Sequence, residues 1–272
     1  GAKDILIPSL TYRRLADLVS WCNLKPKFYD VDLTTLTSSF QHIEDLIDTN
    51  TALVLGVHPM INCFPTEEVR KMCDQKHVPL IMDSVESAFE LEHSCKRVGN
   101  QAEIEIFSMH ASKLLNGAEG GYATTNNYLY YKKLQSLRGF GYSGAENVQY
   151  SDGYNAKLNE AHASLALANL DALPYQINHH KSVYDLYIKN LCNIDDIQIV
   201  RYSNNIRSSY KCILASVDSD VPKMRDKLVL HLNSKNILAR CYYSPPLHET
   251  KMDYPHADIG HLPNTDILSQ KL

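Results

Sequence analysis

The stretch FSMHASKLLNGAEGGYATT, residues 107–125, raises the question on which the rest of the chain depends. An apolar, strand-like run ends at Phe107, and a serine, a histidine and Lys113 follow before the adjacent glycines Gly120 and Gly121. Taken alone, Lys113 is most simply a solvated loop lysine, since lysine is a surface residue in most proteins. Its meaning therefore depends on the elements that surround it.

The composition is that of an ordinary globular protein. The 272 residues are 44% hydrophobic and 21% charged, enough apolar side chains for one large domain or two smaller ones. A net charge of −4 gives no electrostatic reason to expect a nucleic acid or an anionic membrane as partner. No apolar run approaches the length of a membrane span. Seven cysteines without CxxC spacing argue against a disulfide framework or a zinc site and favour the reducing cytoplasm.

Apolar periodicity predicts alternating strands and helices through the first half of the chain. The expected strands are 5–9, 27–31, 51–57, 78–82, 102–107 and 121–124, and the expected helices are 12–23, 42–47, 66–75 and 127–137. Alternation at this spacing favours a mostly parallel sheet with both faces covered by helices.

The pattern changes near residue 159, where a long amphipathic helix begins. Pro174 is expected to kink or interrupt this helix before a further helical run to residue 191, because proline lacks the N–H that the helix needs. Later strands look shorter, and we expect them at 197–201, 210–216 and 238–243, with a helix at 221–233. We therefore predict a large domain over residues 1–175 and a smaller α+β domain over residues 176–272.

Several expected strands end in side chains that carry chemistry. Tyr12 follows the first strand, His58 the third, Asp83 the fourth, and Ser108 with Lys113 the fifth. The carboxyl ends of parallel strands share one edge of a sheet, where ligands bind. An aromatic ring, a carboxylate, a hydroxyl and an amine on one rim are what a pyridoxal phosphate site needs. The amine forms a Schiff base, and the carboxylate keeps the pyridine nitrogen protonated so that the ring accepts electrons.

Each of these residues also has a simpler interpretation. Asp83 after a strand is often a helix N-cap, Ser108 can satisfy a turn, and Tyr12 can pack in a core. The cofactor interpretation rests on their joint occurrence.

Four further segments resemble a known family. They are IPSLTY (7–12), IMDSVESAF (81–89), DGYNAKLNEAHASLALANLDAL (152–173) and LARCYYSPPLHE (238–249). With the opening stretch, and above all its S-x-H-x-x-K spacing followed by E-G-G, they resemble the DegT/DnrJ/EryC1/StrS nucleotide-sugar aminotransferases. The resemblance implies a fold-type-I pyridoxal-phosphate-dependent transferase, with a mostly parallel large domain and a smaller α+β domain.

The resemblance implies a role for each residue of the rim. Lys113 would form the Schiff base and then shuttle a proton, Asp83 would bind the pyridinium nitrogen, and Tyr12 would stack on the ring. Ser108 would contact the cofactor phosphate. Asn155 would reach the phosphate of the neighbouring subunit's cofactor, which implies a homodimer with shared active sites.

Other positions follow from the same resemblance. Glu86 would lie near the phenolic oxygen of pyridoxal 5′-phosphate, where only a protonated carboxyl can donate a hydrogen bond. Candidate substrate contacts are His110, Arg240, Tyr242 and His248. No metal ligand set is expected.

The implied function is that of a cytoplasmic aminotransferase. It would convert a nucleotide-linked 4-keto-6-deoxyhexose, such as dTDP-4-keto-6-deoxyglucose, to the 4-amino sugar with glutamate as donor. The run LRGFGYSGAENV (137–148) most resembles members that make dTDP-viosamine, a 4-amino-4,6-dideoxyglucose. Family members carry an N-terminal Ser-Gly-Thr loop that cradles the cofactor phosphate, and a final helix. We expect both the loop and the final helix to be missing from the 272 residues of this chain.

Four alternatives stay open. A 3-aminotransferase of the same family fits the same motifs. A related sugar dehydratase would carry histidine in place of Lys113. A catalytically inactive relative would act as a binding or interaction protein. A nucleotide-binding oxidoreductase is suggested by G-x-G-x-x-G at 139–144, although that motif follows an expected helix, whereas the dinucleotide fingerprint follows a strand.

Overall fold

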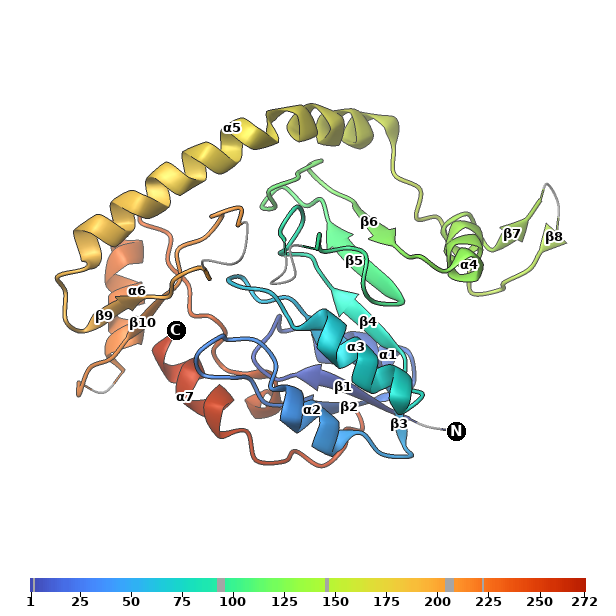
Figure 1. Ribbon diagram of the computed structural model, residues 1–272, viewed down its shortest axis with the longest axis horizontal. Helices are drawn as coiled ribbons and strands as arrows, with labels where there is room; N and C mark the ends of the chain where they lie inside the picture. The colour runs from blue at the N-terminus through green and yellow to red at the C-terminus, as the bar shows by residue number, and fades with distance from the viewer. Residues whose placement is uncertain (2, 92–95, 145–146, 204–207, 222) are drawn as a thin grey trace.

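The computed structural model describes residues 1, 3–91, 96–144, 147–203, 208–221 and 223–272. At its centre lies a six-stranded sheet in the order β2-β1-β3-β4-β5-β6 (Figure 1). The strands are β1 (Asp4–Pro8), β2 (Lys25–Tyr29), β3 (Thr51–Val57), β4 (Leu80–Asp83), β5 (Ile104–Ser108) and β6 (Gly121–Thr124). The first five are parallel, and β6 runs antiparallel to β5. The prediction of a mostly parallel sheet is confirmed.

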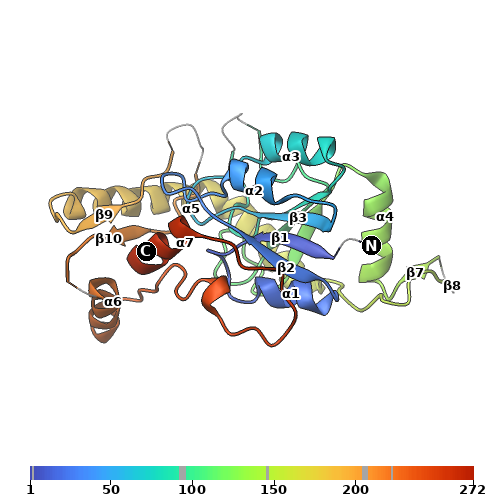
Figure 2. The same cartoon turned by 90° about the horizontal axis from the view of Figure 1, so that it is seen from below.

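Helices cover both faces of this sheet. α1 (Leu15–Trp21) lies on one side, and α2 (Phe40–Leu46) and α3 (Thr66–Gln75) lie on the other (Figure 2). Successive β1 residues therefore face opposite cores, with Leu6 packed in the cluster that contains Val69 of α3, and Ile7 in the cluster that contains Leu15 of α1. Because both faces are buried, the strand is a continuous apolar run without polar alternation.

A helix and a hairpin extend from the β6 edge of the sheet (Figure 1). α4 (Tyr128–Arg138) begins at the cap Asn127 and leads to the short strands β7 (Tyr142–Ser143) and β8 (Asn147–Val148). The G-x-G-x-x-G run at 139–144 thus follows a helix, so it lacks the strand that a dinucleotide fingerprint requires. Gly141 has φ +77° and no room for a Cβ beside the carbonyl of Tyr150, which explains the glycine by local folding.

The long helix α5 (Glu160–Leu191) passes through Pro174 without a break. Of the two predicted outcomes at Pro174, a kink or an interruption, the interruption is not found. A proline removes one backbone hydrogen bond, and a helix of 32 residues keeps many others on either side. The proposed boundary between residues 175 and 176 falls inside this helix, so α5 spans both proposed domains (Figure 1).

The C-terminal part is smaller. A two-stranded antiparallel sheet is formed by β9 (Ile197–Ile199) and β10 (Ala215–Val217), and it is accompanied by α6 (Met224–Ser234), the 3₁₀ turn η1 (Leu247–Glu249) and α7 (Pro263–Lys271). The strand expected at 238–243 is not found. The N–H of Tyr242 instead donates to the carbonyl of Leu272, just after α7, so this segment pairs with a helix end.

The helix α7 is attached to the central sheet by a buried carboxylate. Asp30 follows β2, is 5% exposed, and accepts hydrogen bonds from the backbone N–H groups of Asn264 (3.0 Å) and Thr265 (2.8 Å). The hydroxyl of Thr265 donates to the same carboxylate at 2.7 Å. An acidic group at the start of a helix satisfies N–H groups that have no partner within the helix. These hydrogen bonds therefore hold the start of α7 against the end of β2 in the central sheet.

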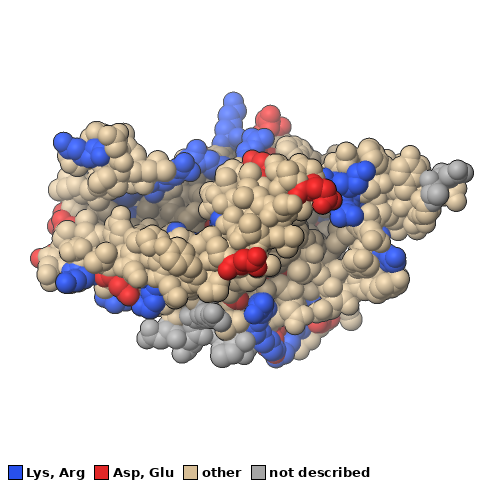
Figure 3. Space-filling view, turned by 90° about the horizontal axis from the view of Figure 1, so that it is seen from above, with Lys and Arg blue, Asp and Glu red and all other residues tan. Residues whose placement is uncertain are grey.

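The surface shows charges of both signs. On the face in Figure 3, Lys and Arg side chains are spread over several parts of the molecule, with Asp and Glu between them. Within the described part of the chain, no helix is long and apolar enough to cross a membrane.

Candidate active site

The carboxyl ends of β4 and β5 bring together the central residues of the predicted site. Asp83 ends β4 and is paired with Ile106 of β5, and Ser108 ends β5. Lys113 lies in the loop between β5 and β6, and Glu86 in the turn after β4. The amine of Lys113 contacts the carboxylate of Glu86, and each of these two side chains is 17% exposed. The amine of Lys113 and the carboxylate of Glu86 therefore meet near the carboxyl ends of β4 and β5.

The loop that carries Lys113 is held by its own backbone. The N–H of Lys113 donates to the carbonyl of His110 at 2.9 Å, and Met109 is bonded through its N–H to Gly120 and through its carbonyl to Gly117. These bonds fold the loop back on itself. The backbone that carries the Lys113 side chain is therefore held in one position by these hydrogen bonds.

Glu86 lies between two ammonium groups. One carboxylate oxygen contacts Lys113, and the other accepts from Nζ of Lys211 at 3.0 Å. Burial raises the pKa of Glu86, but the charges of Lys211 and Lys113 outweigh this and leave the pKa below its usual range. Glu86 is therefore ionised. The protonated form that a hydrogen bond to a phenolic oxygen requires is not the one this environment favours.

Asp83 behaves differently although it lies only three residues away. Burial raises its pKa to about 6, a hydrogen bond from the N–H of Val85 acts in the opposite direction, and the negative charge of Glu86 raises the pKa further. The positive charge of Lys113 lowers it. Asp83 is thus a half-buried carboxylate on whose pKa the charge of Lys113 acts, and a cationic partner would be favourable there.

Tyr12 lies at the same rim with its ring available. Its residue is 59% exposed, in the turn after β1. The neighbouring phenol is Tyr243, whose pKa is raised by burial and further by Glu86, Asp83 and Tyr12. An exposed aromatic ring is able to stack on a flat ligand.

Ser108 and His110 make local contacts. Ser108 Oγ accepts from the N–H of His110 at 3.2 Å, the turn role that its position also allowed, and its hydroxyl proton remains available to a ligand. His110 is exposed, and its Nδ1 lies 2.9 Å from the hydroxyl of Ser112.

Asn155 and Arg240 are both exposed on the described part of the chain. Asn155 is exposed between β8 and α5, where its backbone forms an isolated bridge with Gly139. Arg240 is also exposed. Within the part of the chain that the structure describes, neither residue forms a hydrogen bond or an ion pair with Lys113, Glu86 or Asp83.

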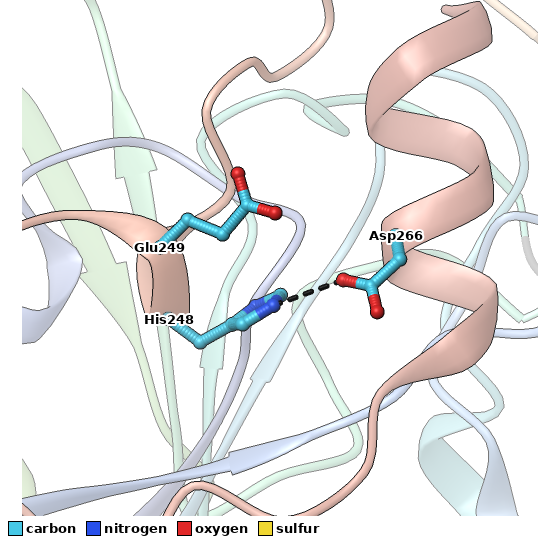
Figure 4. Close-up of side chains that lie close together, drawn as sticks. All are labelled: His248, Glu249 and Asp266. Carbon is cyan, nitrogen blue, oxygen red and sulfur yellow. Dashed lines mark hydrogen bonds and ion pairs between the residues drawn. The ribbon is translucent and has the colours of Figure 1, made fainter.

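Tyr242 and His248 are engaged inside the protein. The hydroxyl of Tyr242 is buried and accepts from the N–H of Met60 at 3.1 Å. His248 Nδ1 lies 2.7 Å from the hydroxyl of Ser9, and its Nε2 lies 3.0 Å from Asp266 of α7 (Figure 4). Both side chains thus join the C-terminal part to the sheet, and these contacts do not support the predicted role in substrate binding.

Glu249 completes a small cluster with His248 and Asp266. One ligand-type atom of each residue lies within 4.8 Å of the others (Figure 4). Both ring nitrogens of His248 already have protein partners, and Glu249 is exposed. The cluster is explained as a connection between η1, α7 and β1.

The two glycines of the opening stretch are required by close contacts within the fold. Gly120 has φ +124°, and a Cβ there would lie 2.7 Å from Leu158. A Cβ on Gly121 would lie 2.5 Å from the carbonyl oxygen of Phe107, across the β5–β6 pair. Gly121 therefore permits the close strand pairing, and Gly120 permits the positive φ beside Leu158.

Lys211 and Tyr243 were missed by the sequence analysis. Lys211 precedes the apolar run 212–215 and Tyr243 ends the predicted strand 238–243, so both looked like parts of ordinary elements. Their position at the rim results from the packing of the C-terminal part against the sheet. A lysine next to an apolar run was the one available signal, and it is a weak one.

Known proteins are similar to this chain over most of its length. Two curated relatives are a dTDP-4-amino-4,6-dideoxy-D-glucose transaminase from Shigella dysenteriae and a GDP-perosamine synthase from Escherichia coli O157:H7. The first is 29% identical over 222 residues, which are 82% of this chain and 60% of that protein. The second is 26% identical over 266 residues, 94% of this chain and 71% of that protein. The chain thus spans less than two thirds of the first relative's length.

A solved structure has the same fold. Helicobacter pylori PseC, an aminotransferase involved in the biosynthesis of pseudoaminic acid, superposes with a TM-score of 0.90 at 20% identity. The superposition covers 99% of this chain and 72% of PseC. The model of the DegT/DnrJ/EryC1/StrS aminotransferase family matches residues 1–272. The chain therefore belongs to the DegT/DnrJ/EryC1/StrS aminotransferase family.

Proposed function

We propose that this protein is a pyridoxal-phosphate-dependent aminotransferase that acts on a nucleotide-linked 4-keto-6-deoxyhexose with glutamate as amino donor. Pyridoxal 5′-phosphate is the cofactor of the family. The observation that carries the proposal is the group at one sheet edge formed by Lys113, the ionised Glu86 and the half-buried Asp83.

The residues present fit this cofactor. A carboxylate can accept several hydrogen bonds, and the half-buried Asp83, with a raised pKa, favours a positively charged N–H partner such as a protonated pyridine nitrogen. Lys113 provides an amine beside it, and the exposed ring of Tyr12 provides a stacking surface. When bound, the cofactor supplies an electron sink for a carbanion.

The chain's own residues then have separate tasks. Lys113 would hold the cofactor covalently and would take and return the proton at the substrate carbon. Asp83 would hold a proton on the ring nitrogen, and Glu86, ionised between two lysines, would fix the position of Lys113. Ser108 has a hydroxyl proton to donate to the phosphate, and Asn155 would act across a homodimer interface.

The choice of a 4-keto sugar rests on the two curated relatives. One is named for a 4-amino-4,6-dideoxyglucose linked to dTDP and the other for a GDP-linked perosamine, so both the nucleotide and the sugar are part of the proposal. The odd set of cysteines without metal-type spacing supports a reducing compartment, which is the cytoplasm for an enzyme of nucleotide sugars.

The test of the cofactor is covalent and residue-specific. Purified protein is incubated with pyridoxal 5′-phosphate, reduced with borohydride and digested, and the modified peptide is identified by mass spectrometry. We expect the label on Lys113 and a visible absorbance band that changes when glutamate is added. Lys113→Ala should lose both signals, whereas Lys181→Ala, which removes an exposed lysine of α5, should keep them.

A second measurement tests the substrate. The loaded protein is given glutamate with 4-keto-6-deoxyhexoses linked to dTDP or to GDP, and the products are analysed by mass spectrometry and NMR. An amine at C4 is expected. An amine at C3 would instead support the 3-aminotransferase, and a protein that takes up no pyridoxal phosphate would support a non-catalytic relative.

A further inference from the structure

Lys211 has a place in the site that none of the sequence motifs assigns. It reaches the rim from the C-terminal part, just before β10, and its side chain is 10% exposed. Its Nζ lies 3.0 Å from one oxygen of Glu86, while Lys113 contacts the other oxygen. One half-buried carboxylate is therefore shared by two lysines from distant parts of the chain.

The segment that carries Lys211 is fixed against the large sheet. Ser209 is 3% exposed and donates its hydroxyl to Glu90 at 3.1 Å. The thiol of Cys212 donates to the carbonyl of Met60 at 3.4 Å. These contacts lie on both sides of Lys211 along the chain. The contacts of Ser209 and Cys212 thus fix the backbone at Lys211, and from there its side chain reaches Glu86.

The other titratable groups near Glu86 do not replace the two lysines. Burial raises the pKa of Cys212, Tyr242 and Tyr243, so these side chains are neutral near pH 7. Asp83 and Glu90 are acids. Among the lowering influences on the pKa of Glu86, which burial opposes, the charge of Lys211 is the largest.

This arrangement matters because Lys113 reacts only as a neutral amine. Attachment to an aldehyde joins the amine nitrogen to the aldehyde carbon and releases one water molecule, and an ammonium has no lone pair for that step. A carboxylate beside an amine favours the ammonium, and a second cation on the same carboxylate opposes that effect.

We propose that Lys211 is a positioning residue of this site, which neutralises Glu86 and thereby keeps the amine of Lys113 available for covalent attachment. The inference rests on the proposed function for its purpose. Its physical content, the coupling of Lys113 to Lys211 through Glu86, is measurable in the protein without cofactor. The two proposals can therefore fail separately.

The test measures how fast Lys113 is acylated in the cofactor-free protein. An amine-reactive acylating reagent is added at pH 7.5, and the labelled Lys113 peptide is quantified over time by mass spectrometry. Lys211→Met should slow labelling by about tenfold, because Glu86 is left to pair with Lys113 alone and holds it more strongly in its unreactive, ion-paired form. Lys211→Arg keeps the charge and should stay within about twofold of the wild type.

Glu86→Gln separates coupling from other effects. Alone it should speed the labelling of Lys113, and combined with Lys211→Met it should restore the rate to the wild-type level or above. An unchanged rate in Lys211→Met, or a double variant that stays slow, would overturn the proposal. Should Lys211→Met fail to fold, as judged by circular dichroism, Lys211→Gln removes the same charge with a polar side chain and takes its place in both measurements.

The chain contains a matched control on its surface. Glu67 of α3 is also shared by two lysines, Lys71 at 3.0 Å and Lys96 at 2.7 Å, and both lysines are at least half exposed. Lys96→Met should change the labelling of Lys71 by less than about twofold, because solvent and salt screen exposed pairs. A large change at Lys71 would mean that burial at Glu86 is not what makes the coupling strong.

Discussion

The carboxylate of Asp83 is held in a place that disfavours its charge. Its pKa rises from an ordinary value of 3.8 to about 6, chiefly because it is buried at the end of β4. Between these two values the folded protein binds more protons than the unfolded chain, so the free energy of unfolding falls as pH rises through that range. Above pH 6 the full cost remains unless a cationic ligand offsets it.

We expect Asp83→Asn to stabilise the cofactor-free protein while it abolishes turnover. At pH 7.5 the free energy of unfolding should rise by about 2 kcal/mol, and at pH 4 the gain should disappear because the wild-type carboxyl is then protonated. Turnover should fall by orders of magnitude, since an amide cannot keep a ring nitrogen protonated. Urea unfolding at the two pH values and a steady-state assay test this, and near-normal turnover would contradict the role of Asp83.

At this scale the sequence predicted the residues whose position is local. Asp83, Glu86, Ser108 and Lys113 follow directly from two strand ends, and parallel strands place those ends at one edge. Lys211 was not predictable in this way, because its position depends on how two distant parts of the chain pack. The ionised state of Glu86 follows from Lys211 and was unpredictable for the same reason.

Among the elements, the central strands were the easiest to predict. β3 (Thr51–Val57) and β6 (Gly121–Thr124) have the predicted bounds. For β3, an apolar run between turn residues favours a strand in a sheet that is covered on both faces. The segment 238–243 has the same apolar character, but its backbone pairs with the end of α7. Local pattern cannot distinguish these cases, because the partner of a strand is a tertiary property.

Pro174 provides a prediction about α5. It is exposed within the helix, so its replacement restores a backbone hydrogen bond without disturbing a core. Pro174→Ala should raise the free energy of unfolding by about 1–2 kcal/mol, less than the full helix-propensity difference because proline also restricts the unfolded chain. Urea denaturation gives the value, with Asn178→Ala, another exposed position of α5, as the reference change. Destabilisation would show that the helix needs its proline.

Across the whole molecule, a few polar contacts join the end of the chain to its beginning. Asp30 holds the start of α7, and His248 joins Ser9 to Asp266. These residues lie in different predicted domains, and no local pattern indicated their contact. In the C-terminal motif SPPLHE, His248 was expected to contact the substrate. Its two ring nitrogens instead have Ser9 and Asp266 as partners, so this side chain connects two parts of the fold.

We expect Asp30→Asn to destabilise the protein by about 1–3 kcal/mol, because buried N–H groups of α7 lose a charged acceptor. Asp152→Asn, at an exposed position, should change the stability by only a few tenths of a kcal/mol. Thermal and urea unfolding of both variants provide the measurement. Equal stability of the two variants would show that α7 is held by apolar packing alone.

The proposed shared site makes a prediction for mixed subunits. Asn155→Ala and Lys113→Ala should each be inactive or nearly so when pure. If Asn155 serves the neighbouring subunit, a mixed dimer contains one intact site, and an equal mixture should recover about a quarter of the wild-type rate. The two proteins are unfolded together, refolded and assayed. A mixture as inactive as its components would place Asn155 and Lys113 of one chain in the same site, or remove Asn155 from the active site altogether.

The capping of α7 by Asp30 also affects how the protein can be made. During synthesis the segment after β2 leaves the ribosome long before α7 has been translated. The carboxylate of Asp30 therefore stays hydrated and without its helix partner until most of the polypeptide has been made. The first strands can pair early, but their surroundings become native only when the stretch around residue 265 emerges. Nascent chains halted before that point should accordingly be cut by proteases near residue 30, and chains that extend well past α7 should resist.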